Sequence, residues 1–292
     1  MRSLLFVPGD SEKKLEKGMS SGADVLIVDL EDSVAPERKA IARKLAADFI
    51  AARRGEAGPL LYVRVNELDG GLTDDDLAAV IASGPDGIML PKCAGAPDVT
   101  RLSVKLRVAE AEAGLEDGSV RVLPIITETA RALLAASTFT EATPRLSGLT
   151  WGAEDLSADI GARETRDQRG LYTDVFRLAR ATTILAANAT QTAAIDTVFV
   201  DFRDMDTLAA ECANAERDGF TGKMAIHPAQ VPVINDAFTP SGDSIAQARA
   251  VVTAFADAGN PGVVGIGGKM FDRPHLRRAE RLLARAAAAG LA

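Results

Sequence analysis

The chain has 292 residues, 47% of them hydrophobic, with 33 basic and 41 acidic residues and a formal net charge of −8. The length allows one large α/β domain or two ordinary ones, and the negative balance argues against nucleic acid or an anionic membrane as the main partner. Cys93 and Cys212 have no close-spaced partner, so we expect free thiols in a reducing compartment, by default the cytoplasm. No apolar run approaches the roughly 18 residues of a membrane-spanning helix.

Short apolar runs rich in β-branched residues predict strands, and they alternate with longer amphipathic stretches that predict helices. The predicted strands are residues 3–9, 24–30, 60–66, 87–92, 120–127, 146–152, 196–202 and 222–228. Predicted helices cover 36–53, 72–82, 97–113, 129–137, 171–189 and 205–217, several with Asp, Ser or Thr placed to cap them. Eight βα units in a chain of this length favour a (β/α)8 TIM barrel over a doubly wound sheet.

The chain beyond residue 236 does not continue this repeat. It contains a predicted helix at 243–258, the Gly-rich segment NPGVVGIGGKMFD and a final helix from about residue 274. The Gly-rich segment lacks the spacing and the Ser/Thr of a phosphate-binding loop, so a flexible arm is the better interpretation. We therefore expect a barrel with the active site at 1–236 and a C-terminal helical extension or lid at 237–292.

In a (β/α)8 barrel, the residues that do chemistry lie at the carboxyl ends of the strands and in the loops that follow. Any one polar side chain there could simply be solvated, but here most of the predicted strands deliver one to the same end, which predicts a site rich in carboxylates. These residues are Asp29, Glu31, Asp32, Arg64, Asn66, Lys92, Glu128, Glu154, Asp155, Asp201, Arg203 and His227.

Two of these carboxylates are candidate metal ligands. Glu128 in PIITET and Asp155 in TWGAEDL follow adjacent predicted strands, with no cysteine or histidine nearby. Carboxylate oxygens of this kind suit Mg²⁺ and leave coordination positions for water and substrate, although helix capping is an alternative for both residues. His227 and His275 are the only histidines, so zinc or a Ser-His-Asp triad is poorly supported, and we interpret His227 as structural.

Arg64 lies in an otherwise apolar predicted strand, so its guanidinium should emerge at the rim, where it could bind a carboxylate in a bidentate way. Lys92 could supply a second cation, although pairing with Glu31 is an equally good interpretation. Together with Mg²⁺, these cations describe a site for a small α-keto or α-hydroxy acid.

The chain resembles the citrate lyase beta subunit family, which includes malyl-CoA and citramalyl-CoA lyases. The resemblance covers nearly the whole chain and rests on ordered motifs: RSLLFVPGDSEKKLEKG, DVLIVDLEDSVAPERKA, YVRVNELDGG, GIMLPKC, PIITET, TWGAEDL and GFTGKMAIHPAQV. It implies a (β/α)8 barrel, a homotrimer or a hexamer built of trimers, and a Mg²⁺-dependent lyase that breaks a carbon–carbon bond in a 3-hydroxyacyl-CoA.

The resemblance also implies roles for single residues. Glu128 and Asp155 match the family's metal ligands, and Arg64 matches the arginine that holds the keto-acid carboxylate. In the pair Glu31-Asp32, the Asp is expected to hydrogen-bond metal-bound water. The expected substrate contacts are Arg64, Lys92, Gly152, Ala153 and Glu154.

The tail GKMFDRPHLRRA resembles a family segment whose Asp is contributed to the neighbouring subunit's site. Asp272 is therefore a candidate acid/base acting in trans, with Phe271 in place of the family's usual Ile. For the phosphates of CoA, Arg2, Lys13 and Lys14 are candidate partners, although solvated surface charge is the better interpretation of each.

The implied reaction is a retro-aldol or retro-Claisen cleavage. Mg²⁺ would chelate the substrate's hydroxyl and carboxylate, and cleavage would give a 2-oxo acid (oxaloacetate, glyoxylate or pyruvate) and an acetyl-CoA enolate for Asp272 to protonate. The alternatives are a malyl-CoA-type thioesterase, a beta subunit of a citrate lyase complex acting on a carrier-bound acyl group, and a non-enzymatic binding scaffold.

Overall fold

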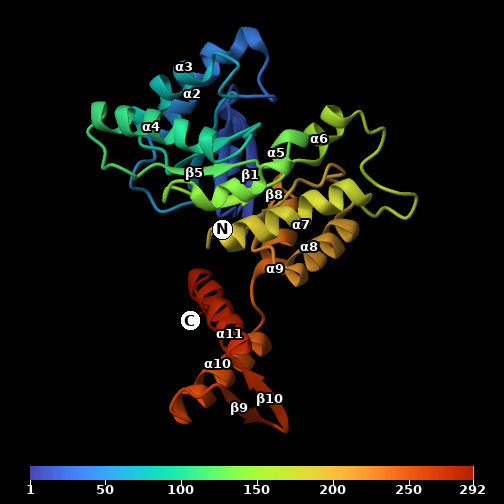
Figure 1. The fold of residues 1–292 in the computed structure, drawn as a ribbon. Coiled ribbons are helices and arrows are strands. Elements are labelled where there is room, and N and C mark those ends of the chain that lie inside the picture. Colours follow the sequence, from blue (N-terminus) through green and yellow to red (C-terminus); the bar gives the residue numbers. More distant parts are fainter. Residues whose placement is uncertain (292) are drawn as a thin grey trace. The chain divides into compact units, whose positions relative to one another are not determined.

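The computed structural model describes residues 1–291, which divide into a compact unit Met1–Asn235 and a second unit that begins at Asp236. The first unit is a barrel of parallel strands surrounded by helices (Figure 1). The second contains two long helices and a β-hairpin. Within residues 1–291, no helix combines the length and the apolar character needed to cross a membrane.

Eight parallel strands form the barrel wall in the order β5-β4-β3-β2-β1-β8-β7-β6. Single bridges from Val122 to Leu146 and from Ile125 to Thr150 connect β5 to β6, so the barrel is nearly closed. The predicted (β/α)8 barrel with C-terminal helices is therefore confirmed. The strands are β1 Ser3–Pro8, β2 Val25–Asp29, β3 Leu60–Arg64, β4 Gly87–Leu90, β5 Arg121–Pro124, β6 Gly148–Thr150, β7 Ala193–Asp196 and β8 Gly222–Ala225.

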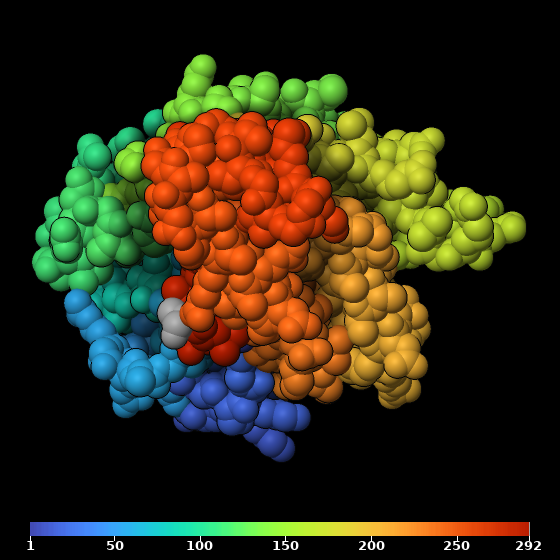
Figure 2. All heavy atoms as spheres, turned by 90° about the horizontal axis from the view of Figure 1, so that it is seen from below, coloured from blue at the N-terminus to red at the C-terminus, as the bar shows by residue number. Residues whose placement is uncertain are grey.

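The helices of the barrel fall between the strands, as the amphipathic stretches predict. Their bounds are α1 Glu12–Met19, α2 Lys39–Ala51, α3 Thr73–Val80, α4 Ala96–Glu112, α5 Ala130–Leu134, α6 Ala153–Ile160, α7 Asp174–Ala189, α8 Met205–Asp218 and α9 Gln230–Phe238, with short 3₁₀ helices Pro36–Arg38, Ile81–Ser83 and Ala136–Glu141. The sequence did not predict α1, α6 or α9. Segment 161–173, in yellow-green, projects from the barrel between α6 and α7 (Figures 1 and 2).

The strand predicted at 196–202 is wrong in position, because β7 is Ala193–Asp196 and residues 197–202 form the loop that follows it. The apolar run Val198-Phe199-Val200 has the stronger β signal in the sequence. In the structure, however, Phe199 is buried in that loop, where its carbonyl accepts a hydrogen bond of 2.9 Å from the side chain of Gln230. Burial of Phe199 therefore accounts for one apolar residue of the run without a strand, while Val200 is exposed.

Side chains that point inward from the strands fill the barrel. The packing is tight at Gly87, where a Cβ would lie only 2.4 Å from the ring of Tyr62. Such close packing makes the interior a solid core, so ligands can bind only at the ends of the strands. The inner residues are Leu4, Val25, Ile27, Tyr62, Met89, Leu123, Ile125, Ile195 and Met224.

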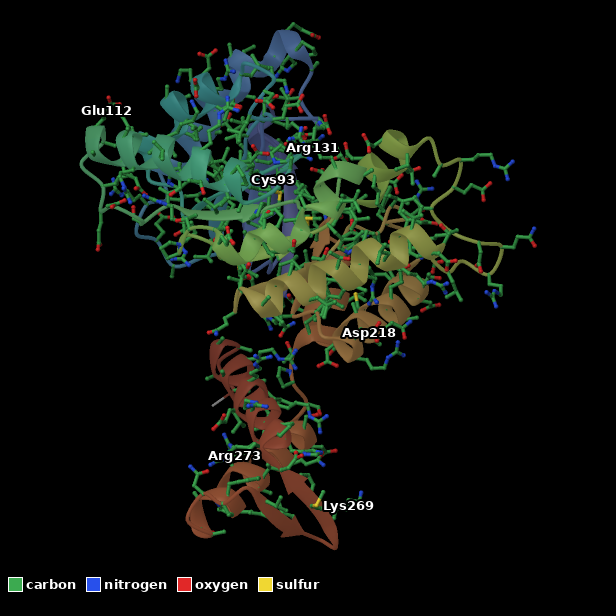
Figure 3. The ribbon with its side chains drawn as sticks, viewed as in Figure 1. Cys93, Glu112, Arg131, Asp218, Lys269 and Arg273 are labelled. Atoms are coloured by element: carbon green, nitrogen blue, oxygen red, sulfur yellow. The ribbon has the colours of Figure 1, made fainter. Side chains whose placement is uncertain are left out.

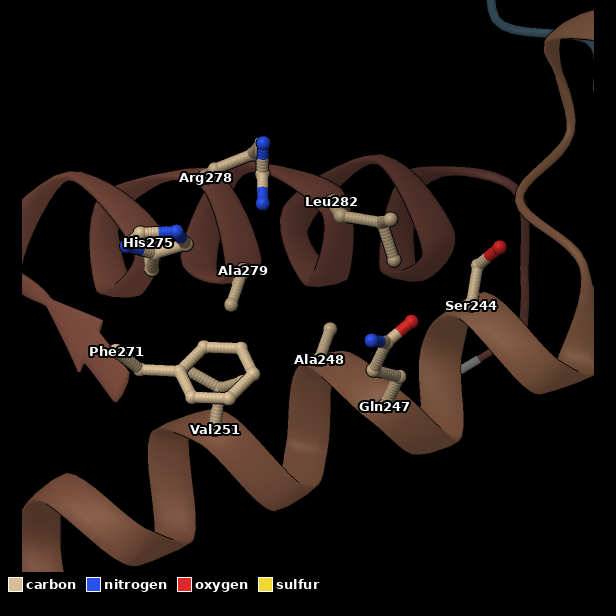
Figure 4. A pocket seen from close by; sticks show the side chains of 9 residues that line it. All are labelled: Ser244, Gln247, Ala248, Val251, Phe271, His275, Arg278, Ala279 and Leu282. Atoms are coloured by element: carbon tan, nitrogen blue, oxygen red, sulfur yellow. The ribbon is translucent and has the colours of Figure 1, made fainter. Parts of the chain in front are cut away.

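The C-terminal unit consists of α10 Gly242–Asp257, β9 Val263–Ile266, β10 Lys269–Asp272 and α11 Arg273–Ala288. The expected flexible arm is wrong, because its glycines form the turn of an antiparallel hairpin between β9 and β10. Gly267 and Gly268 both have positive φ, 56° and 76°, as a two-residue hairpin turn requires. Helices α10 and α11 face each other across a hollow lined by Val251, Phe271 and His275 (Figure 4).

Candidate active site

A cavity of about 290 Å³ opens among residues at the carboxyl ends of the barrel strands. Phe6, Ile125 and Met224 give it an apolar floor, while Arg64 and several carboxylates give it polar walls. Of the expected site residues, Arg64, Glu128, Gly152, Ala153, Glu154 and Asp155 line this cavity, whereas Glu31, Asp32 and Lys92 do not.

Arg64 is held by a carboxylate of the neighbouring strand. Its Nε and Nη2 donate to the two oxygens of Asp29 at 2.8 and 2.7 Å, a fork that the parallel pairing of β2 with β3 sets up. Burial raises the pKa of Asp29, but the hydrogen bonds from Arg64 and from the Glu31 and Ser33 amides outweigh it, so the pKa lies below its ordinary value. Asp29 is therefore ionised and fixes the guanidinium.

Glu31 connects Arg64 to Lys92. It is 4% exposed, with Oε1 2.5 Å from the Lys92 Nζ and Oε2 2.9 Å from the Arg64 Nη1. The contact with Nη1 is an ion pair without hydrogen-bond geometry. Burial raises the pKa of Glu31 more than the two cations lower it. Lys92 therefore pairs with Glu31, the alternative that the sequence left open, and the side chain of Asp32 is 60% exposed.

The segment that carries Glu31 is anchored by Lys39, which the sequence did not indicate. The Nζ of Lys39, the first residue of α2, donates to the carbonyl oxygens of Leu30 and Glu31 and to Oδ1 of Asn66, each at 2.8 Å. No sequence signal marks Lys39, because these contacts form only when α2 folds back onto β2 and β3. The loop after β2 is therefore fixed before any ligand binds.

Glu128 and Asp155 face the same cavity, and within residues 1–291 neither forms a salt bridge with a Lys, Arg or His. Glu128 is 3% exposed and accepts the backbone N–H of Lys92 at Oε2. Burial first, and then the charge of Asp155, raise its pKa well above the ordinary value. A cation between the two carboxylates would relieve both effects.

Helix capping does not explain these carboxylates. The N-cap of α5 is Thr129, whose side chain accepts the N–H of Ala132, so Glu128 lies one residue before the cap. Asp155 lies in the first turn of α6, after the N-cap Gly152. A Cβ on Gly152 would lie 2.8 Å from Cγ of Glu128, so the glycine leaves room for this buried side chain.

The donor set fits a hard divalent cation. Glu128 and Asp155 offer only oxygen, and the part of the chain that the structure describes has no group of three or more His, Cys, Asp or Glu placed to hold a metal alone. Mg²⁺ binds in this way, through one or two carboxylates with water or substrate in the other positions. Zinc, which needs three or four protein ligands, does not fit.

Both cysteines are buried and free, as expected. Burial raises the pKa of each thiol to about 12, so neither is a nucleophile at neutral pH. Cys93 lies inside the barrel unit, directly after Lys92 (Figure 3).

His227 has the contacts expected of a structural residue. Its ring stacks on Phe202 at 4.9 Å, and its Nδ1 accepts the N–H of Ala229 at 3.1 Å. Of the cations considered for CoA, Arg2 precedes β1 and binds Asp24 at the amino ends of the strands, opposite the cavity, so it does not belong to this site. Lys13 and Lys14 are exposed on α1.

Asp272, in the C-terminal unit, is the N-cap of α11. Its Oδ1 lies 2.5 Å from Nδ1 of His275, and this hydrogen bond lowers the pKa of Asp272. Asp272 is therefore ionised at neutral pH, the form of a base. The Asp-x-x-His spacing of a capping box was visible in the sequence and would have identified His275 as its partner.

Comparison with known proteins identifies the family. The model of the HpcH/HpaI aldolase/citrate lyase family matches residues 2–228. A (3S)-malyl-CoA thioesterase of Cereibacter sphaeroides is 35% identical over 292 residues, which cover 98% of this chain and 95% of that protein. Citramalyl-CoA lyase, mitochondrial, of Rattus norvegicus is 32% identical over 298 residues, which cover 97% of this chain and 85% of that protein.

A solved structure agrees with these relatives. The protein CitE of Mycobacterium tuberculosis, in complex with magnesium, acetoacetate and coenzyme A, has a TM-score of 0.75 and 34% identity, with 98% of each chain covered. The expected resemblance is therefore confirmed, and the chain belongs to the HpcH/HpaI aldolase/citrate lyase family.

Proposed function

We propose that the chain is a Mg²⁺-dependent carbon–carbon lyase for a 3-hydroxyacyl-CoA of the citryl-, malyl- or citramalyl-CoA type. The products would be a 2-oxo acid and acetyl-CoA or a related acyl-CoA. The observation that carries this proposal is the pair of carboxylates, Glu128 and Asp155, which face a cavity beside Arg64 and form no salt bridge among the described residues 1–291. The CitE complex with magnesium, acetoacetate and coenzyme A supports it, as do the relatives named for malyl-CoA and citramalyl-CoA.

Glu128 and Asp155 would hold the metal, which supplies a Lewis acid for the substrate's hydroxyl and carboxylate oxygens. Arg64, fixed and kept charged by Asp29, would bind the carboxylate of the 2-oxo acid. Its Nη1 has an N–H to offer, because the contact with Glu31 lacks hydrogen-bond geometry. The apolar floor would exclude water from the carbon that carries negative charge after cleavage.

The cavity volume limits what can be enclosed. About 290 Å³ is at the lower end of ligand pockets, which hold about 300–1,000 Å³. A small oxo acid and the reacting end of the thioester fit this space, so the nucleotide part of CoA would lie outside the cavity.

The C-terminal unit is proposed to act as a lid on a neighbouring subunit of a homotrimer or hexamer, where Asp272 would join the site. Its carboxylate is 39% exposed, which leaves it accessible. Because the contact with His275 lowers the pKa of Asp272, the carboxylate would have to gain a proton before it could protonate the enolate carbon.

A thioesterase is the second candidate, favoured by the relatives named (3S)-malyl-CoA thioesterase. One assay separates the candidates: purified protein and Mg²⁺ are incubated with citryl-, malyl- and citramalyl-CoA, and the 2-oxo acid and free CoA thiol are measured in parallel. A lyase releases the oxo acid without the thiol, and a thioesterase releases the thiol without the oxo acid. Turnover only of the same acyl groups on an acyl carrier protein would indicate a complex subunit.

A further inference from the structure

Lys92 has a backbone conformation that its side chain disfavours. It follows Pro91 in the turn after β4, and its φ of 50° lies in the left-handed region. Within residues 1–291, the other non-glycine residues with positive φ are Gln191 and Asn260. A lysine gains nothing locally from this conformation, since its Cβ crowds the following carbonyl and it lacks the short polar group that helps asparagine. Such strain persists only where surrounding contacts impose it.

The contacts of Lys92 supply that constraint. Its backbone N–H donates to Oε2 of Glu128, and its Nζ donates to Oε1 of Glu31 at 2.5 Å. The next residue, Cys93, enters the buried segment before α4, with its Sγ 3.5 Å from the carbonyl of Gly95. At an ordinary φ near −60°, the side chain and the following carbonyl would be rotated by roughly 110° about N–Cα relative to this N–H. The bond from this N–H to Glu128 would then be incompatible with the present path of the chain into Cys93 and α4.

We propose that Lys92 is a positioning residue for the metal ligand Glu128, an inference that rests on the metal site of the proposed function. The ion pair with Glu31 keeps the left-handed turn closed, and the turn aims the Lys92 N–H at Oε2 of Glu128. The other carboxylate oxygen, Oε1, is left on the side of Gly152 and the cavity. Lys92 thereby joins the carboxylate that contacts Arg64 to the carboxylate that would hold the metal.

The alternative, a direct substrate contact by the ammonium group, is less well supported. The Nζ is engaged by Glu31 and lies 3.9 Å from Asp32, and Lys92 is not part of the cavity lining. The two roles make different predictions. Positioning survives loss of the ammonium group wherever residue 92 keeps a positive φ without the ion pair, whereas a direct substrate contact requires the ammonium group itself.

The test is Mg²⁺ titration calorimetry on the metal-free full chain carrying Lys92→Gly, Lys92→Asn or Lys92→Ala. None of these side chains can reach Glu31, but glycine adopts positive φ freely, asparagine tolerates it and alanine resists it. We expect the glycine variant to bind Mg²⁺ within about threefold of the parent, and the alanine variant to bind it about 10- to 100-fold more weakly, the usual loss when a partner of a metal ligand is removed. Asparagine should fall between them.

Equal Mg²⁺ affinity in the three variants, whether unchanged or reduced, would overturn the positioning role. Gln191→Gly and Gln191→Ala are the matched controls, since Gln191 has a φ of 56° but lies between α7 and β7, away from the cavity. They should leave Mg²⁺ affinity unchanged, and melting curves in chelator check that each variant folds. Glu128→Gln separates the two proposals: if it binds Mg²⁺ like the parent, the metal site itself is refuted, whatever the Lys92 variants do.

Discussion

The substitution Gly152→Ala adds one methyl group against the proposed metal ligand. The backbone of Gly152 has φ −120° and ψ 122°, a conformation that alanine adopts without strain. Any effect should therefore come from the methyl group's neighbours. Its carbon would lie 2.8 Å from Cγ, 3.5 Å from Cδ and 3.4 Å from Oε1 of Glu128.

The magnitude follows from these distances. Carbon atoms in contact prefer a separation of about 3.5–4.0 Å, so Glu128 must retreat by about 1 Å. Metal–ligand distances tolerate only about 0.2 Å. We therefore expect Mg²⁺ affinity to fall about 10- to 100-fold, or about 1.4–2.7 kcal/mol.

The assay is Mg²⁺ titration calorimetry of the metal-free protein, with thermal unfolding in chelator to confirm the fold. Gly242→Ala is the control, because a Cβ at the first residue of α10 meets no atom within 4 Å. Unchanged Mg²⁺ affinity in Gly152→Ala would refute the assignment of Glu128 as a metal ligand packed against this glycine.

Further predictions concern stability, substrate binding and assembly. Arg145→Ala leaves Glu110, which is fully buried, without its cation, and should lower the free energy of unfolding in urea at neutral pH by about 3–5 kcal/mol. Burial raises the pKa of Glu110, but the hydrogen bonds from Arg145 and two backbone amides lower it by more, so the folded pKa lies below the ordinary value. The stabilisation is therefore complete above the unfolded pKa of about 4.3 and is lost as the pH falls through the lower folded pKa, so the deficit should shrink in acid. Arg64→Lys keeps the charge but loses the fork with Asp29, and should weaken 2-oxo acid binding at least about 10-fold while leaving Mg²⁺ affinity unchanged; equal loss of both would contradict separate roles. Inactive Asp272→Asn subunits mixed with inactive Glu128→Gln subunits should regain activity if Asp272 acts in trans, and absence of complementation would place it elsewhere.

The sequence predicts the barrel well because most of the buried strands are apolar runs that can be recognised locally. The apolar runs of β1, β2 and β3 have strong local signals, and the parallel order follows from the alternation with helices. The predicted position of β7 was wrong because the local strand propensity of the sequence and the strand pairing in the barrel differ there. Ala193-Ala194-Ile195 is a weak strand sequence that nevertheless forms β7 by pairing with β6 and β8, for example Ile195 with Gly222. The stronger run after it lies in a loop, and of that run only Phe199 is buried.

The residues of the candidate site could be predicted only in part, because some of its contacts depend on tertiary structure. Glu128 and Asp155 could be proposed because strand ends can be counted along the chain. The fork between Asp29 and Arg64 joins residues 35 positions apart, and a single sequence carries no sign of such a contact. The positive φ of Lys92 could not be predicted either, because a lysine in the sequence does not indicate a positive φ as a glycine can.

The most direct test of the central claim is a crystal of the protein soaked with Mn²⁺, which can replace Mg²⁺ at oxygen ligands, and a 2-oxo acid. An anomalous difference map then locates the metal. We expect one peak within coordination distance of both Glu128 and Asp155, with the acid's carboxylate between the metal and Arg64. A peak at Asp29, Glu31 or Asp32 instead, or no peak with the acid bound, would contradict that claim.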